Sequence, residues 1–525
     1  MKQQVIRIFL RALVVTPCIL VLSDCMVEQF ARAQVTTAYP SKTVYQIKGV
    51  QPDVESWGSV GGALWNANVS QLVGNQAGSI AVNFNWSIWE ATSTSSCLAS
   101  QVAFESHCYT VDPTIDTAVQ TFTNQGLAVT GIFYGTPNWA NSGKSCAGSV
   151  WCSPNDAADY ARFVRFIANR YNGIQSHGRV VDFVIHNEVD QKSWYDCGCS
   201  TNAAWEQDYA NNYNAAYDAV KAEQSNARIL MSFDHVWSPA FDSSSTISVS
   251  EFIPAVAALV GTRSWQVAFH PYSNAVGDTT FSPDDINAGY ITFGDIGVIV
   301  GWLQQKYPGS AAATNVELTE SGFDSNASNG RSEAGQNTAV CNSFYNVVGT
   351  PGIDNYIYHR LIDNVNEGGL LLGLWHTDQS QKPSWATWAL ANRSGYYSCG
   401  FSANNYTTLT RSYNSSRGHW ASSRLAPLGF SAEHSFYLTR SALSGTTLLY
   451  ECQVGNHNMI SSSIGCEGSY TNMGPVGYIN NTPAAGLVAL YRCHMNSPLD
   501  HFIGTSASCE GQSVDYLLGY ASQIN

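Results

Sequence analysis

Short β-rich runs alternate with helical patterns from about Tyr45 to Asn392, and this alternation limits the possible folds most strongly. Two parallel strands need a long crossover connection between them, and a helix usually supplies it. Segments such as Asn155–Tyr171 and Trp205–Glu223, with apolar residues three and four apart, fit that role. The predicted strands are Val44–Val50, Ala63–Val69, Val129–Tyr134, Val180–His186, Ile229–Asp234, Trp265–His270, Asn315–Thr319 and Asn355–His359.

Eight strands joined by helices predict an α/β fold of the (β/α)8, or TIM, barrel type with long loops. The run Ile80–Trp86 is interpreted as an inserted hairpin. A doubly wound open sheet would give the same alternation and is the alternative. No glycine-rich phosphate fingerprint follows the first strand, which argues against a nucleotide-binding sheet of that kind.

The N-terminus has the pattern of a secretory signal peptide. Positive residues precede the short apolar run Ala12–Leu22, and Ala31-Arg32-Ala33 supplies a cleavage pattern before Gln34. That run is too short to span a membrane, and no later stretch is long enough. We therefore expect residues 1–33 to be removed and the protein to be secreted, extracellular or periplasmic. A lipoprotein beginning at Cys25 is an alternative, although Asp24 precedes that cysteine.

The cysteine content agrees with export, because an even number of cysteines follows the signal region and oxidising compartments favour disulfides. No cysteine or histidine cluster has zinc spacing, so we expect no metal and no cofactor. Cys197 and Cys199 are too close in sequence to pair easily, and we expect them to reach Cys341 and Cys399. The expected local pairs are Cys97/Cys108, Cys146/Cys152, Cys452/Cys466 and Cys493/Cys509.

The segment 399–525 contains a repeat with a period of about 42 residues. Tyr450-Glu451-Cys452 and Cys466-Glu467-Gly468 recur as Tyr491-Arg492-Cys493 and Cys509-Glu510-Gly511. A fainter copy without cysteines runs from Ser412 to Phe430. Three β-rich units of this length predict a small all-β domain resembling a β-trefoil. We expect residues 34–398 to form the barrel domain and this module to bind carbohydrate or a surface, or to act only as a spacer.

The composition excludes some classes of function. The chain of 525 residues has 25 Lys+Arg against 39 Asp+Glu, a net charge of −14. Such a chain is a poor ligand for nucleic acid or an anionic membrane. Aromatic residues make up 12% of the chain, equal to the charged fraction. Aromatic rings stack on neutral ligands such as sugars, although large hydrophobic cores also contain many of them.

We expect the protein to be a monomer.

Functional residues of a barrel follow the carboxyl ends of its strands, where the loops surround the ligand. Glu188 follows the fourth predicted strand and Glu320 the seventh, so the two face each other across the mouth. Two close carboxylates, one protonated and one ionised, are the apparatus of a retaining glycosidase. Asn187 could bind the sugar 2-hydroxyl, while His270 and Tyr272 could orient the nucleophile and keep it ionised. The other candidate substrate-binding residues are Asp234, His235, His359, Arg360 and Trp375.

The motifs at these strand ends resemble clan A glycoside hydrolases, the retaining (β/α)8 enzymes. The segments HNEVD (186–190), SFDHVW (232–237), AFHPY (268–272), LTESGF (318–323) and YHRLIDNVNEGGLLLGLW (358–375) are similar to secreted bacterial barrel proteins known mainly as an uncharacterised domain related to this clan. The resemblance spans about residues 45–390. It implies that Glu188 is the acid/base, that Glu320 is the nucleophile and that Trp375 is the aromatic platform after strand eight.

Several candidates also have a structural interpretation. Glu317, inside the seventh strand, is the alternative nucleophile. His186, Asp234 and His359 could be hydrogen-bonded groups of the barrel rim. Trp86, Trp89, Trp139 and Trp237 could be packed or exposed.

Three classes of function follow. The first is a retaining glycoside hydrolase acting on a polysaccharide or oligosaccharide. The second is a secreted sugar-binding protein without catalysis, and the third is an adhesin that uses the barrel as a scaffold. No GxSxG nucleophile elbow is present, which argues against a serine hydrolase.

Overall fold

Eight parallel strands close into a barrel, in which the last strand pairs with the first. The computed structural model describes residues 34–41, 47–394, 396–399, 401–402 and 405–524, and the predicted signal peptide lies outside them. In order around the barrel the strands are β1 (Lys48–Val50), β2 (Ser79–Asn85), β5 (Ala128–Tyr134), β6 (Asp182–Ile185), β7 (Arg228–Phe233), β8 (Gln266–Phe269), β9 (Val316–Leu318) and β10 (Ile353–Tyr358). The predicted barrel is confirmed, and the open sheet is excluded because no edge remains between β1 and β10.

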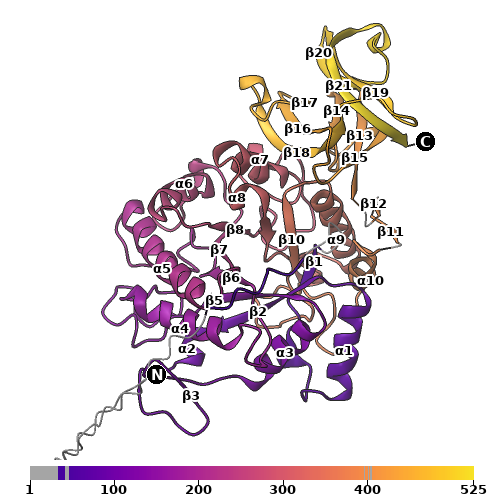
Figure 1. Ribbon diagram of the computed structural model, residues 1–525. Helices are drawn as coiled ribbons and strands as arrows, with labels where there is room; N and C mark the ends of the chain where they lie inside the picture. The colour runs from indigo at the N-terminus through magenta and orange to yellow at the C-terminus, as the bar shows by residue number, and fades with distance from the viewer. Residues whose placement is uncertain (1–33, 42–46, 395, 400, 403–404, 525) are drawn as a thin grey trace, which may run out of the picture. The chain divides into compact units, whose positions relative to one another are not determined.

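Helices follow the strands and pack around the barrel (Figure 1). The third helix starts where Asp112 accepts a hydrogen bond from Thr114 N and Pro113 occupies the first turn, a combination that favours helix initiation. The helices are α1 (Ala63–Gly74), α2 (Trp86–Trp89), α3 (Pro113–Asn124), α4 (Ala157–Arg170), α5 (Asn202–Glu223), α6 (Val249–Leu259), α7 (Gly297–Lys306), α8 (Ala311–Thr314), α9 (Glu333–Val348) and α10 (Pro383–Leu390). Within the described ranges, no helix is both long and apolar enough to cross a membrane.

Two strand predictions at the start of the barrel are wrong. Ala63–Val69 lies in helix α1, whose buried residues Trp65, Val69 and Leu72 are spaced three and four apart along one face. The run Ile80–Trp86 belongs largely to β2, which pairs in parallel with β1 and β5 and is no inserted hairpin. These two errors compensate, because one strand is lost and one is gained. Glu188 therefore still follows the fourth strand of the barrel and Glu320 the seventh.

The barrel interior is filled at mid-height by small and branched side chains from six strands. They form one cluster of buried residues: Ala81, Ile132, Val184, Leu230, Ala268 and Ile357. A larger apolar core lies between the strands and the surrounding helices. The barrel is thus a packed core whose polar groups lie at its two ends.

The amino end of the barrel carries a partly buried ion cluster. Arg228, the first residue of β7, lies 3.3 Å from Glu317 and also pairs with Asp354. Asn355 Nδ2 donates to Glu317 at 3.2 Å, and the ring of Tyr39 lies 3.7 Å from the Arg228 guanidinium. Glu317 is therefore a structural residue at the end of the barrel opposite to Glu320, which removes it as the alternative nucleophile.

An antiparallel all-β domain follows the barrel, as predicted. Its strands come in three sets of three, in which a hairpin is followed by a long third strand. The third strands β15, β18 and β21 pair with one another. The strands are β13 (Tyr406–Asn414), β14 (Gly418–Ser422), β15 (Ser431–Thr439), β16 (Thr446–Val454), β17 (His457–Ser461), β18 (Thr471–Asn480), β19 (Val488–Asn496), β20 (Leu499–Gly504) and β21 (Ser513–Ile524). The structure also contains two short hairpins: β3 (Val102–Phe104) with β4 (His107–Tyr109), and β11 (Tyr397–Ser398) with β12 (Phe401–Ser402).

Six disulfides link the twelve cysteines of the described residues, and the four local pairs are as predicted. The prediction for the other four is wrong. Cys197 pairs with Cys199 across a single residue, and Cys341 pairs with Cys399. Gly198 has φ 66°, a left-handed conformation that brings the two Cα atoms to 5.1 Å, within the usual range for a disulfide.

Lys48 joins the first strand to the last helix of the barrel. Its side chain is fully buried, and Nζ donates to the carbonyl oxygens of Trp388, Ala389 and Ala391 at 3.1, 2.9 and 2.8 Å. These carbonyl groups lie at the carboxyl end of helix α10, where no backbone N–H of the helix is left to donate to them. Nζ also lies 4.7 Å from the centre of the Trp388 ring.

We expect Lys48→Met to lower the free energy of unfolding by about 2–4 kcal/mol, because it leaves buried carbonyl groups without donors. Urea unfolding followed by tryptophan fluorescence measures the change. Lys306→Met, at an exposed position of α7, is the control and should change stability by no more than about 0.5 kcal/mol. Equal stability of the two variants would contradict the role given to Lys48.

Candidate active site

The two predicted glutamates meet at the carboxyl end of the barrel. Glu188 follows β6 and Glu320 follows β9. Three atoms lie within 4.8 Å of one another: a carboxylate oxygen of Glu188, a carboxylate oxygen of Glu320 and a ring nitrogen of His270. The structure thus brings together two carboxyl groups that are 132 residues apart in the sequence.

Glu188 is held tightly by its neighbours. Its backbone has φ 37°, and its N–H donates to Ser232 Oγ at 3.0 Å. A hydrogen bond of 2.8 Å joins its Oε1 to His270 Nδ1. The side chain is buried, and this burial, followed by the negative charges of Asp234 and Glu320, raises the pKa of Glu188 well above its usual value. The raised pKa favours the protonated form of Glu188.

Glu320 has a different environment, because a hydroxyl group donates to it. Tyr272 Oη donates to Glu320 Oε1 at 3.0 Å. Burial and the nearby Glu320 charge raise the pKa of Tyr272 well above its usual value, so the phenol stays protonated. The predicted role of Tyr272 beside Glu320 thus has the required geometry.

His270 does not take the place expected for it. Its Nδ1 bonds to Glu188 rather than to Glu320, while Nε2 is 3.0 Å from Thr319 Oγ1. Burial lowers the pKa of His270, which favours the neutral ring. His270 follows β8, and one of its ring nitrogens lies within 4.8 Å of a carboxylate oxygen of each glutamate, so the place of the strand in the barrel did not decide which glutamate it contacts. His270 therefore orients Glu188.

Asn187, Asp234 and His235 surround Glu188. Asn187 Oδ1 is buried and has no hydrogen-bond partner in the described part of the chain. Asp234 and His235 form an ion pair through Oδ1 and Nδ1. Burial lowers the pKa of His235, but the Asp234 carboxylate outweighs it and the pKa is raised overall. The three predicted residues thus lie beside the proposed acid.

His359 and Arg360 follow β10 and bind carboxylates on neighbouring loops. His359 Nδ1 is 2.9 Å from Gln51 Oε1, and its Nε2 is 2.9 Å from Glu367 Oε1. Arg360 donates to Glu367 Oε1 at 3.0 Å and pairs with Asp53. Burial lowers the pKa of His359, but Glu320 and then Glu367 raise it above its usual value overall. These contacts make both residues part of the wall beside Glu320.

Trp375 is not an aromatic platform. Its side chain is only 2% exposed and packs edge-on against Trp385, with ring centres 5.0 Å apart. The loop after β10 folds back, and Trp375 N bonds to Leu361 O at 2.8 Å, which turns the indole into the core. The assignment of Trp375 to the substrate site is therefore corrected.

An aromatic row that the sequence analysis missed begins at the end of β5. Tyr134 stacks on Trp151 at 5.2 Å, and Trp151 meets Trp194 edge-on at 4.7 Å. Trp194 is 39% exposed. The position of Tyr134 as the last residue of a predicted strand was the signal that could have identified it.

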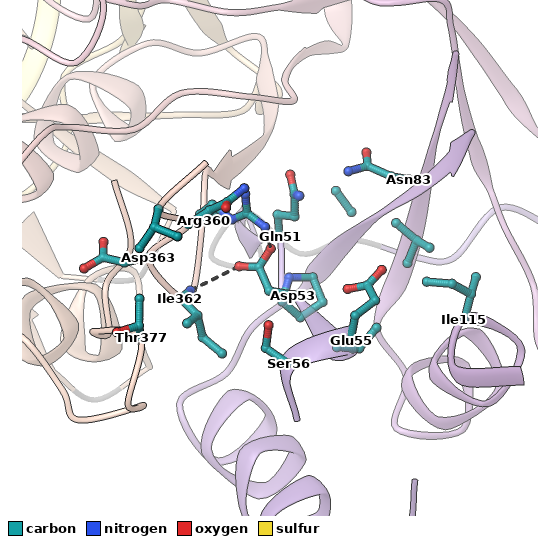
Figure 2. Close-up of a pocket in the computed structure, with 16 residues that line it drawn as sticks. Gln51, Asp53, Glu55, Ser56, Asn83, Ile115, Arg360, Ile362, Asp363 and Thr377 are labelled. Carbon is teal, nitrogen blue, oxygen red and sulfur yellow. Dashed lines mark hydrogen bonds and ion pairs between the residues drawn. The ribbon is translucent and has the colours of Figure 1, made fainter. Parts of the chain in front are cut away.

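A cavity of about 420 Å³ lies between the first two strands of the barrel and the segment that follows its last strand (Figure 2). Its walls come from the segment after β1, from β2 and from the loop after β10. Asp53, Glu55 and Asn83 line it together with Gln51 and Arg360. All of these except Arg360 were missing from the predicted site, although Gln51, Asp53 and Glu55 lie within five residues of the end of the first predicted strand.

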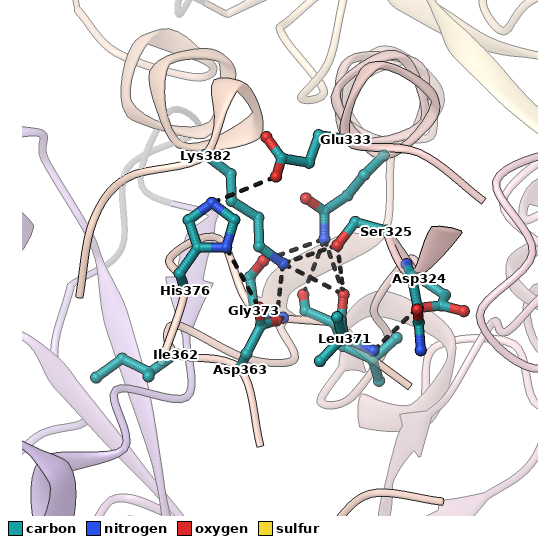
Figure 3. A network of polar contacts seen from close by, with 12 residues as sticks. Asp324, Ser325, Glu333, Ile362, Asp363, Leu371, Gly373, His376 and Lys382 are labelled. Carbon is teal, nitrogen blue, oxygen red and sulfur yellow. Dashed lines mark hydrogen bonds and ion pairs between the residues drawn. The ribbon is translucent and has the colours of Figure 1, made fainter. Parts of the chain in front are cut away.

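The loop after β10 is fixed by a buried polar network (Figure 3). Lys382 Nζ donates to Asp363 Oδ1 at 2.7 Å and to Ser325 Oγ at 2.8 Å. Gly373 N donates to Asp363 Oδ1 at 2.8 Å, and Gln336 Nε2 donates to Gly373 O at 3.1 Å. This network ties the loop to the segment after β9, so the wall of the cavity is held in one conformation.

Glu188, His270 and Glu320 are also the set of side chains, among the residues described, that could hold a metal ion. Both ring nitrogens of His270 already have protein partners, namely Glu188 on one side and Thr319 on the other. A metal would have to replace one of these hydrogen bonds. As it stands, the arrangement can donate a proton from one carboxyl group and attack with the other.

Comparisons with solved structures find similar chains at low identity. A family 39 glycoside hydrolase from Bacteroides cellulosilyticus WH2 is 12% identical with a TM-score of 0.49, over 83% of this chain and 81% of that one. A monomeric beta-xylosidase from Caulobacter crescentus CB15 is 13% identical with a TM-score of 0.47, over 79% and 84%. GH5_18 from Streptomyces cattleya, in complex with GlcNAc, is 14% identical with a TM-score of 0.46, over 65% and 78%.

The comparison with curated proteins finds no match. A family model does match, over residues 46–399, which include the whole barrel and the glutamate pair. The chain belongs to this family, the Family of unknown function (DUF5722).

Proposed function

We propose that this protein is a retaining glycoside hydrolase that cleaves the O-glycosidic bonds of a polysaccharide or oligosaccharide. The observation that carries the proposal is the pair Glu188 and Glu320, whose nearest oxygens lie within 4.8 Å of each other in unlike surroundings. Retaining enzymes hold their two carboxyl groups about 5–5.5 Å apart, whereas inverting enzymes need about 6.5–9.5 Å to admit a water molecule. The short spacing supports retention.

In the first step, Glu188 donates its proton to the glycosidic oxygen while Glu320 attacks the anomeric carbon. The bond from that carbon to the leaving oxygen breaks, and a glycosyl ester on Glu320 forms. In the second step, Glu188 as carboxylate takes a proton from water, and the water oxygen attacks the same carbon and releases Glu320. The two inversions restore the original anomeric configuration, and Glu188 regains its proton.

The surroundings fit these roles. Tyr272 donates to the oxygen Oε1 of Glu320, which leaves the other oxygen for the attack. His270 orients Glu188 through Oε1. The unpartnered amide oxygen of Asn187, described above, accepts a hydrogen bond from a sugar hydroxyl, and contacts of this kind strengthen in the transition state.

We also propose that the protein acts outside the cytosol. Six disulfides are typical of proteins from oxidising compartments. In this proposal the signal-like N-terminus directs export, and the β domain within residues 399–525 is an accessory carbohydrate-binding module.

Glu188→Gln and Glu320→Gln test the reaction. Each should lower kcat on natural glycans by about 10²–10⁴-fold, because each removes a group that acts in the transition state. Glu188→Gln should retain more activity on aryl glycosides, whose leaving group needs no proton. Reducing-end assays on a glycan panel measure the loss, and NMR of the fresh product identifies its anomer.

Glu251→Gln, at an exposed position of α6, and dialysis against EDTA are the controls and should leave kcat unchanged. Inverted product would contradict the retaining mechanism. Binding of a glycan without hydrolysis of any panel member would favour a non-catalytic sugar-binding protein or adhesin.

The pH dependence provides a second test. Glu188 must be protonated to act, so kcat/KM should fall as the pH rises through its raised pKa. Asp234→Asn removes a negative charge that favours the protonated form, and the alkaline limb should move to lower pH. His235 loses its partner in this variant, but Asp234 acts on Glu188 more strongly than His235 does. An alkaline limb that stays in place or moves to higher pH would contradict this assignment.

A further inference from the structure

The cavity and the surroundings of the glutamate pair share a wall. Gln51 and Arg360 line the cavity, and His359, which lies next to Arg360 in the chain, bonds to Gln51 at 2.9 Å. Glu320 influences the pKa of His359, and Glu320 and Glu55 both raise that of Tyr134 after burial has raised it. The cavity therefore lies within a few side chains of the carbon that Glu320 would attack. Its volume of about 420 Å³ is within the range of small-molecule sites, about 300–1,000 Å³.

Most charges that line this cavity are neutralised within the protein. Asp53 pairs with Arg360 and accepts Ile362 N at 3.1 Å. Asp363 pairs with Lys382 at 2.7 Å, and the remaining charge of Arg360 is shared with Glu367. The carboxylates on these walls thus hold the loops together and contribute little to a ligand.

Glu55 is the exception. It lies in the one-turn segment Val54–Ser56 after β1, its side chain is exposed, and it has no ion-pair partner among the described residues. Figure 2 shows Glu55 beside Asp53, with Asn83 across the open space from them. Partial burial raises the pKa of Glu55 above its usual value. In its ionised form the carboxylate accepts hydrogen bonds from hydroxyl groups and repels anions, and the Asn83 amide can both donate and accept.

We propose that this cavity holds the non-reducing sugar of the substrate, and that Glu55 restricts it to a neutral monosaccharide unit, excluding uronic and sulfated sugars. This inference rests on the proposed function, because it assigns one side of the same site. Two unit charges about 4 Å apart near a protein surface repel strongly enough to change affinity by more than about 100-fold. A bound uronate would meet that repulsion, whereas a neutral sugar would gain hydrogen bonds to Glu55 and Asn83.

The experiment uses the full chain with Glu320→Gln, so that bound sugars are not hydrolysed. The probes are methyl β-D-glucopyranoside and methyl β-D-galactopyranoside, each compared with its uronide. Saturation-transfer NMR titrations give the four affinities. We expect the neutral glycosides to bind at least 30-fold more tightly than the uronides.

Adding Glu55→Gln should reduce this preference at least tenfold, and Glu55→Lys should reverse it. Glu251→Gln in the same background is the control and should leave the preference unchanged. Circular dichroism melting checks that each variant is folded. Equal binding of neutral and acidic glycosides, a preference insensitive to Glu55, or no binding of either neutral glycoside would overturn the proposal.

Failure of this inference is distinguishable from failure of the proposed function. Hydrolysis of glycans by the unmodified protein, combined with a preference that Glu55 does not affect, would reject only the role of the cavity. A Glu55-dependent preference without hydrolysis of any glycan would support the cavity assignment and reject the enzymatic one.

Discussion

Closure of the eight-stranded parallel sheet is the constraint on which the site depends. Because all strands run in one direction, every strand end meets at a single mouth, and residues far apart in the chain become neighbours there. Glu188, His270, Tyr272 and Glu320 come from three different strand ends. The opposite end of the barrel carries the Arg228 ion cluster described above. The polar groups at that end contact one another, whereas those at the mouth surround the glutamate pair.

The pair of glutamates is chemically useful because its two members have unlike surroundings. Glu188 is buried near the negative charges of Asp234 and Glu320, which favours its protonated form. Glu320 accepts a hydrogen bond from the phenol of Tyr272. A low local dielectric makes each of these effects larger than it would be in water. The proposed division into acid and nucleophile rests on these differences in the neighbouring side chains.

The barrel and the two glutamates could be predicted because both follow from local patterns. Alternating strand and helix segments specify the barrel, and a glutamate after a strand falls at its mouth. The misassignment of Ala63–Val69 arose because a short apolar run fits a strand or a helix equally well. Trp375 was misplaced because its loop returns to the core, and sequence spacing does not encode the direction of a long loop. The Cys197–Cys199 pair depended on the left-handed conformation of Gly198.

The sequence by itself determined the fold class, the family, the four local disulfides and the identity of the carboxyl pair, because each rests on residues close together or on a periodic pattern. Tertiary structure decided which glutamate His270 contacts, which carboxylates are neutralised, and that Glu55 has no ion-pair partner among the described residues. The reason is physical: hydrogen bonds and ion pairs depend on distances of a few ångströms between segments that only closure of the barrel brings together. Charge compensation in particular is a property of the folded site, since Asp53 and Glu55 are alike in sequence and differ only in what lies beside them.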